Sequence, residues 1–333
     1  DQMKPQELTQ SLVDVVSHEF FHTLTPLNIH SEEIHNFEYN TPLMSKHLWM
    51  YEGTTEYFAN LFQINQGLID EQNFYNRILE KLNYSKRYDD SMSFTKMSAG
   101  IVDEPFQANY GNVYQKGALI NMCLDIIIRE QSGGENGILW VMQKLAKRYG
   151  SERPFKDDEL FNEIIQMTYP EVGEFFVNHV EGTKPIDYMD YFAKVGLTMG
   201  DTEVPLRSIL FKDDKNPFFE PKPNDTGTVQ YVVNGLNTTI EAMGVKIGDV
   251  FLGLDGKMLP EIKEENIDEI NSIFTSSFMW DNQTEFTITV KRGKETFTLS
   301  GITGSPSALV SGVINDPNAN NAAVSLRNAW MKN

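Results

Sequence analysis

The chain has 333 residues, of which 40% are hydrophobic, and this is enough to fill the cores of two domains. Its 47 acidic residues outnumber the 28 basic ones and give a net charge of −19, so its surface repels phosphate backbones and we expect no nucleic-acid partner. The longest apolar run, residues 118–128, contains Asn121 and Asp125. It is shorter than the roughly 20 residues that cross a bilayer, so the sequence predicts no membrane span.

The first 200 residues have a helical pattern. Apolar residues recur three and four positions apart in segments that proline, glycine and asparagine separate. We therefore expect a mainly α-helical domain over residues 1–200. The predicted helices are 8–24, 45–66, 71–84, 112–131, 135–149, 157–168 and 186–194.

The composition then changes. Residues 201–225 are rich in proline, aspartate and lysine and predict a linker or an irregular first strand. Residues 226–304 predict a small α+β domain, because short β-branched and aromatic segments alternate with turns around one helix at 264–275. The predicted strands are "TVQYVVNG", "DVFLGLDG", "EFTITVKR" and "ETFTLSGI". Residues 305–333 predict a tail that ends in a short docking helix.

The stretch "VVSHEFFHTLTPLNIH" near the start of the chain contains the pattern H-E-x-x-H, formed by His18, Glu19 and His22. Residues four apart lie on one face of a helix, so both imidazoles can reach one metal ion while Glu19 projects beside it. The alternative is a pair of buried core histidines. Because the pattern arises by chance in only about one such sequence in a hundred, we favour the metal site.

A catalytic zinc ion needs three protein ligands and one open position for water. The candidate for the third ligand is Glu52, which opens an apolar-periodic helix in "KHLWMYEGTTEYFANLF". In one class of zinc peptidases a second helix supplies a glutamate of this kind, whereas the alternative is an exposed helical carboxylate. Glu56 follows one turn later. It is either a solvated side chain or the acceptor for the N–H of a ligating imidazole.

With three ligands, zinc lowers the pKa of its bound water to about 7. Glu19 can then take the proton and pass it to the leaving amine. The oxyanion also needs a hydrogen-bond donor, and a tyrosine hydroxyl is one candidate. Tyr110 and Tyr114 both lie just before a long apolar helix, and composition does not choose between them.

Three ordered motifs, "HEFFH", "LWMYEGTTEYFANL" and "VYQKGALINMCLDIIIRE", resemble the glycyl aminopeptidase family of gluzincin zinc metallopeptidases. The segments "YFAKVGLTM", "AMGVKIGDVFLGLDGK" and "LRNAW" extend the resemblance over nearly the whole chain. The resemblance implies that His18, His22 and Glu52 bind one Zn²⁺ ion and that Glu19 is the general base. The family pattern Y-x-K-G matches Tyr114 to the transition-state tyrosine, which leaves Tyr110 as the alternative oxyanion donor.

The family joins a thermolysin-like catalytic domain to a C-terminal PDZ domain. The resemblance therefore implies a multidomain chain, with the helical lobe of a gluzincin catalytic domain in residues 1–200 and a PDZ-like domain in residues 226–304. In the family, an N-terminal β domain and a β lobe precede the H-E-x-x-H helix, so we expect this chain to be a fragment with a half-built substrate cleft. The nearest candidate for a carboxylate-binding PDZ loop is "SILF" at 208–211.

We thus expect a zinc-dependent metallopeptidase that acts on peptides as an aminopeptidase. We also expect an exported, periplasmic or extracellular protein, although this sequence contains no signal peptide. Cys123 is the only cysteine, which excludes an internal disulfide. The alternative is a non-catalytic scaffold that captures C-terminal peptides at its PDZ-like module. The intact Glu19 argues against it, since this residue is not a ligand and a scaffold has no need of it.

A second polar cluster, "NIHSEEIH" at residues 28–35, lies between the two predicted ligand helices. Its spacing matches no closed zinc pattern, so we expect loop residues there. We assign no function to His47 or His179.

Overall fold

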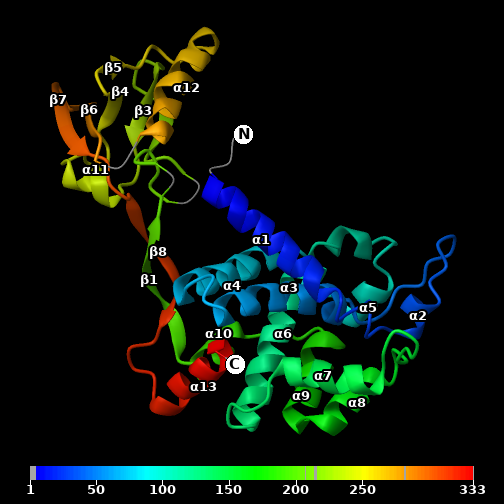
Figure 1. Cartoon of the computed structure of the whole chain (residues 1–333). Helices are drawn as coiled ribbons and strands as arrows, with labels where there is room; N and C mark the ends of the chain where they lie inside the picture. The colour runs from blue at the N-terminus through cyan, green and yellow to red at the C-terminus, as the bar shows by residue number, and fades with distance from the viewer. Residues whose placement is uncertain (1–4, 207, 214–215, 281–282, 333) are drawn as a thin grey trace. The chain divides into compact units, whose positions relative to one another are not determined.

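The computed structural model describes residues 5–206, 208–213, 216–280 and 283–332. The chain combines helices with antiparallel strands (Figure 1) and forms two compact units. The first unit comprises Asp1–Met199 with Gly312–Asn333, and the second comprises Gly200–Ser311. Among the described residues, no helix is long and apolar enough to cross a membrane.

The first unit is helical. Six of its helices, α3, α4, α6, α7, α8 and α10, lie within one residue of the predicted ranges or inside them. The helices are α1 (Pro5–Phe21), α2 (Glu32–His35), α3 (Leu48–Asn65), α4 (Glu71–Ser85), α5 (Phe94–Ala99), α6 (Asn112–Gln131), α7 (Ile138–Arg148), α8 (Leu160–Met167), α9 (Pro170–Phe175), α10 (Tyr188–Lys194) and α13 (Asn321–Lys332), with the short turns η1 (Phe106–Asn109) and η2 (Phe176–Val180).

The first helix differs from its predicted range of 8–24. It begins at Pro5 and ends at Phe21, because the backbone then tightens into turns in which Thr23 N donates to Phe20 O and Leu24 N donates to Phe21 O. Pro26 follows and has no N–H with which to continue a helix. His22 therefore lies just beyond the helix that carries His18.

Helices α3 and α6 touch through their backbones. A Cβ atom placed on Gly53 would lie 2.5 Å from the carbonyl carbon of Gly117, which is closer than real Cβ contacts. Next to this crossing, Asn121 Nδ2 donates to Trp49 O over 2.8 Å, and Thr54 Oγ1 donates to Asn121 Oδ1 over 2.8 Å. The two glycines thus let α3 and α6 approach at the turn of α3 that carries Glu52.

The C-terminal helix α13 completes the core of this unit. The side chain of Trp330 is fully buried, and its Nε1 donates to Tyr57 Oη over 2.6 Å. Tyr57 Oη in turn donates to Asp125 Oδ2 over 2.6 Å, and Arg129 Nε donates to Asp125 Oδ1 over 3.1 Å. A buried polar chain therefore connects α13 to α3 and α6.

The second unit is an antiparallel sheet in the order β2-β3-β4-β6-β7, with β5 paired to β4. Its aromatic core includes Phe218, Phe219 and Phe251. The chain enters this unit along β1 (Leu197–Pro205) and leaves it along β8 (Ser307–Asn315), and these two strands pair. The other elements are β2 (Phe219–Pro223), β3 (Val229–Val233), α11 (Thr238–Ala242), β4 (Val250–Leu254), β5 (Lys257–Met258), η3 (Glu264–Asn266), α12 (Ile267–Ser276), η4 (Ser277–Met279), β6 (Glu285–Arg292) and β7 (Glu295–Ile302).

Turn residues explain two of the strand connections. Asp255 and Gly256 have φ angles of 50° and 73° between β4 and β5, which is the geometry of a two-residue hairpin turn. Gly293 has a φ of 62° in the turn that joins β6 to β7. Residues 219–223, in the segment predicted to be a linker or an irregular first strand, pair with β3 as strand β2. The predicted domain limits at residues 200, 225 and 304 remain predictions.

Candidate metal centre

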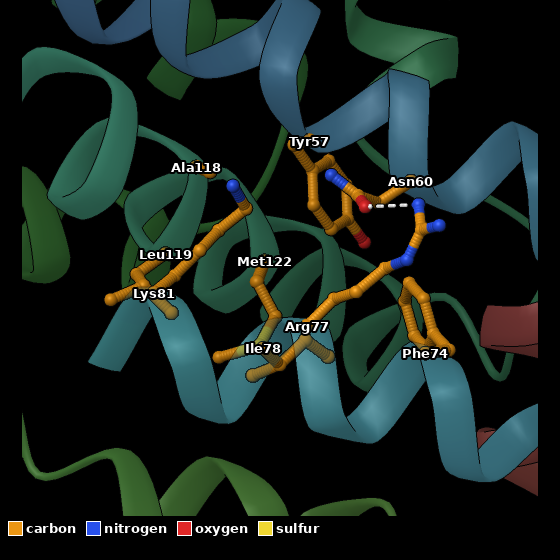
Figure 2. A pocket seen from close by; sticks show the side chains of 9 residues that line it. All are labelled: Tyr57, Asn60, Phe74, Arg77, Ile78, Lys81, Ala118, Leu119 and Met122. Carbon is orange, nitrogen blue, oxygen red and sulfur yellow. Dashed lines mark hydrogen bonds between the residues drawn. The ribbon is translucent and has the colours of Figure 1, made fainter. Parts of the chain in front are cut away.

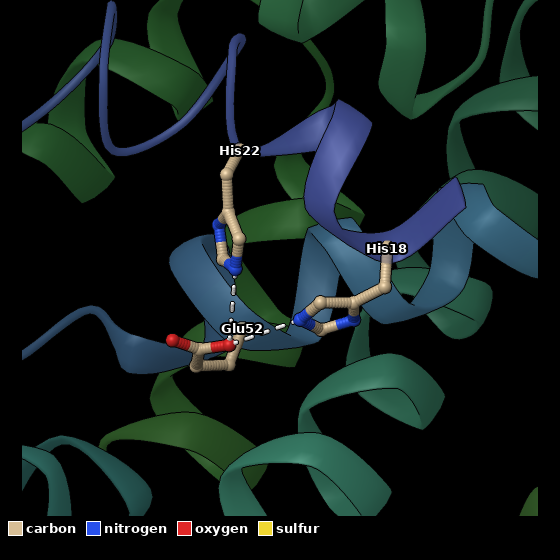
Figure 3. A group of neighbouring side chains, drawn as sticks. All are labelled: His18, His22 and Glu52. Atoms are coloured by element: carbon tan, nitrogen blue, oxygen red, sulfur yellow. Dashed lines mark ion pairs between the residues drawn. The ribbon is translucent and has the colours of Figure 1, made fainter. Parts of the chain in front are cut away.

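Helix α1, the turn that follows it and helix α3 bring three predicted ligands together (Figure 3). His18 Nε2 lies 3.4 Å from Glu52 Oε2, and His22 Nε2 lies 3.6 Å from the same oxygen. One ligand atom from each residue lies within 4.8 Å of the other two. Phe21 fixes α1 on α3, since its ring packs 5.4 Å from the ring of Phe58. Three side chains that can each supply one ligand atom to a metal ion therefore lie together.

Both imidazoles are oriented by their other ring nitrogen. His18 Nδ1 lies 2.9 Å from Glu56 Oε2, and His22 Nδ1 lies 3.1 Å from the carbonyl oxygen of Thr25. A carboxylate and a carbonyl can only accept, so both Nδ1 atoms donate. In the neutral imidazoles the lone pairs are then on the Nε2 atoms, which face Glu52. The turn that ends α1 at Phe21 supplies the Thr25 carbonyl.

The charged side chains around His18 and Glu56 shift the pKa values of both residues. Burial disfavours the charged imidazolium of His18, but hydrogen bonds to Glu52 and Glu56 outweigh burial and raise its pKa to about 9. Burial likewise opposes ionisation of Glu56, but His18 and Lys81 outweigh it and lower the pKa of this carboxyl to about 2. Lys81 from α4 forms an ion pair with Glu56 Oε1. Without a metal ion, His18 is thus held as a cation between two carboxylates.

The donor set fits a zinc ion. Two imidazole nitrogens and one carboxylate oxygen are a usual ligand set for catalytic zinc. Glu52 Oε2 is buried and accepts no hydrogen bond of good geometry among the described residues. Its polar neighbours are His18 Nε2 and His22 Nε2, at 3.4 and 3.6 Å. A cation among these three atoms would supply Glu52 Oε2 with a partner.

Glu19 and Tyr114 lie beside this cluster. The Glu19 side chain is exposed and forms no hydrogen bond or ion pair with any residue that the structure describes. The ring centroids of Tyr114 and His18 are 5.9 Å apart. Burial, a hydrogen bond to Tyr110 and the negative charge of Glu52 raise the pKa of the Tyr114 hydroxyl well above its usual value. The phenol of Tyr114 is therefore a proton donor, not a phenolate, at neutral pH.

Tyr110 is close to Tyr114 but farther out. Their hydroxyl oxygens are 3.2 Å apart, and the side chain of Tyr110 is 49% exposed. The structure thus brings both tyrosines to the same place, with Tyr114 against the histidine ring.

The remaining histidines have other partners. His30 Nε2 lies 3.0 Å from His35 Nδ1, and His30 Nδ1 bonds the carbonyl of Pro26. His47 is buried and uses both ring nitrogens, toward Asp157 O and Trp49 Nε1. His179 Nδ1 bonds the carbonyl of Lys184. Within the described ranges, only His18, His22 and Glu52 form a group of three potential metal ligands.

Two groups that contact the candidate site, the Thr25 carbonyl and the Lys81 side chain, were not predicted from the sequence. The Thr25 carbonyl is a backbone group, so no side-chain pattern reveals it. Lys81 had a detectable signal, because it lies three positions after Ile78 on the apolar side of α4, whose buried residues include Ile78 and Leu82. A charge on the buried face of an amphipathic helix needs a partner.

Residues 11–120, which contain every ligand candidate and both tyrosines, match the sequence family described as M61 glycyl aminopeptidase. Over these residues the chain is similar to the M61 glycyl aminopeptidases. This is a family of peptidases, and the matched region ends inside α6, just past Gly117. No curated protein matches the chain.

A solved structure has a similar fold. It is an aminopeptidase N family protein from Idiomarina loihiensis, which aligns with a TM-score of 0.57 at 20% sequence identity. The alignment covers 99% of this chain and 56% of the other one. The chain thus spans little more than half the length of that neighbour.

Proposed function

We propose that the chain contains the zinc centre of a metallopeptidase that hydrolyses peptides as an aminopeptidase. The observation that carries this proposal is the convergence of ligand atoms from His18, His22 and Glu52 within 4.8 Å, with Glu52 Oε2 buried between the two Nε2 atoms. The match of residues 11–120 to a peptidase family supports it. We also propose export to the periplasm or the exterior, the location expected from the sequence.

A zinc ion held by His18, His22 and Glu52 would supply Lewis-acid polarisation of a water molecule and of the substrate carbonyl. Glu19 has an exposed carboxylate one position after His18. In the proposed reaction it takes a proton from the attacking water and returns it to the leaving amine. Tyr114 keeps its phenolic proton and donates a hydrogen bond to the oxyanion. Glu56 and the Thr25 carbonyl keep the imidazoles in orientation.

The second unit is proposed to be PDZ-like, with two helices and an antiparallel sheet. The alternative function, a scaffold that captures C-terminal peptides, would add a peptide strand to an open sheet edge. Strand β2 is one such edge of the sheet. The question is whether its outward backbone groups can bind a strand.

The register of β2 on β3 shows which backbone groups of β2 face outward. Val233 of β3 donates its N–H to Asp249 O and accepts from Gly248 N, so neither group is available to β2. Phe219, which lies opposite Val233, therefore directs its own N–H and C=O away from β3. Alternation places Pro221 and Pro223 outward as well. Proline has no N–H, so this edge loses two of its three outward donors. Peptide addition at β2 is therefore disfavoured, and the observation does not favour the scaffold.

The substitution Glu19→Gln tests the proposed reaction. Because Glu19 is not a ligand, we expect the variant to keep the zinc content of the wild type and to lose hydrolysis of aminoacyl reporter amides by about 10²–10⁴-fold. Elemental analysis and initial rates measure the two quantities. The matched control is Glu32→Gln, an exposed glutamate of α2, which should leave both unchanged. Undiminished hydrolysis by Glu19→Gln would contradict the proposed reaction.

A further inference from the structure

Lys81 and Glu56 form an ion pair behind His18. Lys81 Nζ contacts Glu56 Oε1, while Glu56 Oε2 lies 2.9 Å from His18 Nδ1. The side chains of Lys81 and His18 are each 13% exposed, and that of Glu56 is 25% exposed. Two successive contacts thus link Lys81 on α4 through Glu56 on α3 to the candidate zinc ligand His18 on α1.

The surroundings of Lys81 are apolar. Figure 2 shows its aliphatic stem with Ile78, Leu119 and Met122 around a small cavity between α3, α4 and α6. This cavity has a volume of about 10 Å³, which is room for no more than about one water molecule. A buried ammonium ion needs a partner other than bulk water, and Glu56 is that partner. Lys81 is therefore placed for this contact and not for solvation.

The two contacts fix the carboxylate of Glu56. Its two oxygens lie in one plane, so binding Oε1 to Lys81 decides where Oε2 points. Since Oε2 accepts from His18 Nδ1, the lone pair of the neutral imidazole is on Nε2, 3.4 Å from Glu52 Oε2. Without Lys81, Glu56 could rotate away, and neither the ring angle nor the tautomer of His18 would be fixed.

We propose that Lys81 is a positioning residue of the zinc centre, which acts through Glu56 to orient His18 for the metal. The inference rests on the proposed function, because it assumes that His18 is a ligand. It assigns to α4 a role in zinc affinity, although α4 contributes no ligand.

Zinc affinity, measured by competition with a chromophoric chelator, tests this inference without an activity assay. Lys81→Met keeps most of the stem volume and removes the charge, and we expect it to weaken zinc binding about tenfold. Lys81→Arg, which restores a cation, should bind within about threefold of the wild type. Lys86→Met, at an exposed lysine at the end of the same helix, is the matched control and should leave the affinity unchanged.

A double-mutant cycle shows whether Lys81 acts through Glu56. In the Glu56→Gln background, Lys81→Met should weaken zinc binding no further, because the contact is already lost. Circular dichroism checks that each variant folds, and Lys81→Gln replaces Lys81→Met if the latter does not. Unchanged affinity in the Lys81 variants, or additive effects with Glu56→Gln, would overturn this inference alone. A wild-type chain that binds no zinc would instead contradict the proposed function.

Discussion

At the scale of single residues, Tyr114 and Tyr110 present two hydroxyls 3.2 Å apart next to the candidate metal centre. The ring of Tyr114 lies 5.9 Å from the ring of His18, tilted by 37°, and burial raises the pKa of the Tyr114 hydroxyl. We therefore expect Tyr114 to be the donor to the oxyanion in the proposed reaction.

We predict that Tyr114→Phe lowers kcat about 10²–10³-fold, as expected for loss of one oxyanion donor. Zinc content should not change, because the phenol is not a ligand. Tyr110→Phe should lower kcat less than about threefold, because Tyr110 is half exposed and its hydroxyl lies next to that of Tyr114 instead of the His18 ring. Steady-state kinetics on both variants measures the difference. Equal losses in the two would show that the phenols act as a pair.

Residue patterns revealed part of the site. The spacing of His18, Glu19 and His22 and the position of Glu52 predicted which side chains would meet, because helix geometry fixes which residues share a face. The same periodicity did not reveal which side of α1 is buried, since Val15, Val16 and Phe20 of the motif region are more than half exposed. It could not reveal Lys81 as a partner of Glu56, since that contact depends on how α4 packs on α3.

At the scale of elements, the crossing of α3 and α6 positions the site. Gly53 follows Glu52 and meets Gly117, the glycine of the Y-x-K-G pattern, three residues after Tyr114. Backbone contact at this point holds Glu52 and Tyr114 on adjoining turns of two helices. A side chain at either glycine would separate them.

We predict that Gly53→Ala destabilises the first unit by about 2 kcal/mol or more, because the added Cβ would overlap backbone atoms that cannot move aside. The sign of the change in unfolding free energy is informative, because without this contact alanine would stabilise the helix by about 1 kcal/mol relative to glycine. Urea unfolding followed by circular dichroism measures the change. Gly304→Ala, where a Cβ would meet no atom within 4 Å, serves as the control. A stabilised Gly53→Ala variant would show that the helices do not touch there.

Elements with a clear local pattern were predictable and elements without one were not. The range of α6 equals its predicted range, and the predicted strands of β6 and β7 have the bounds that the structure gives them. Helices α2 and α5, with four and six residues, are too short to show a period. Strand β8, "SALVSGVIN", contains Ser311 and Gly312, which read as turn residues. Its pairing with β1 joins segments about 110 residues apart, beyond the reach of any local pattern.

In the molecule as a whole, each of the two units has a hydrophobic core of its own. In the second unit, Asp249 is 2% exposed and accepts two hydrogen bonds of 2.7 Å from the Arg292 guanidinium. Burial opposes ionisation of Asp249, but Arg292 and the Lys246 N–H outweigh it and hold the pKa below its usual value. The folded state therefore binds a proton at Asp249 less readily than the unfolded state does.

The stability that Asp249 contributes is present above the unfolded carboxyl pKa of about 4 and is lost as the pH falls through the lower folded pKa. We predict that Asp249→Asn lowers the unfolding free energy of the second unit by about 2 kcal/mol at pH 7, and that the difference from the wild type shrinks below about pH 4. Amide hydrogen exchange in β4 and β6, followed as a function of pH in both proteins, measures the difference in unfolding free energy. A difference that grows toward low pH would have the wrong sign for this account.

The proposed zinc centre requires that the chain bind one metal ion with His18, His22 and Glu52. Native mass spectrometry of the chain purified with zinc counts the bound ions, and competition with a chelator gives the affinity. We expect one zinc ion per wild-type chain and at least about 100-fold weaker binding after Glu52→Ala or after the double change His18→Ala and His22→Ala, because a three-ligand site loses one or two of its ligands. A wild-type chain that binds no zinc, or variants that bind zinc as tightly as the wild type, would rule out this site.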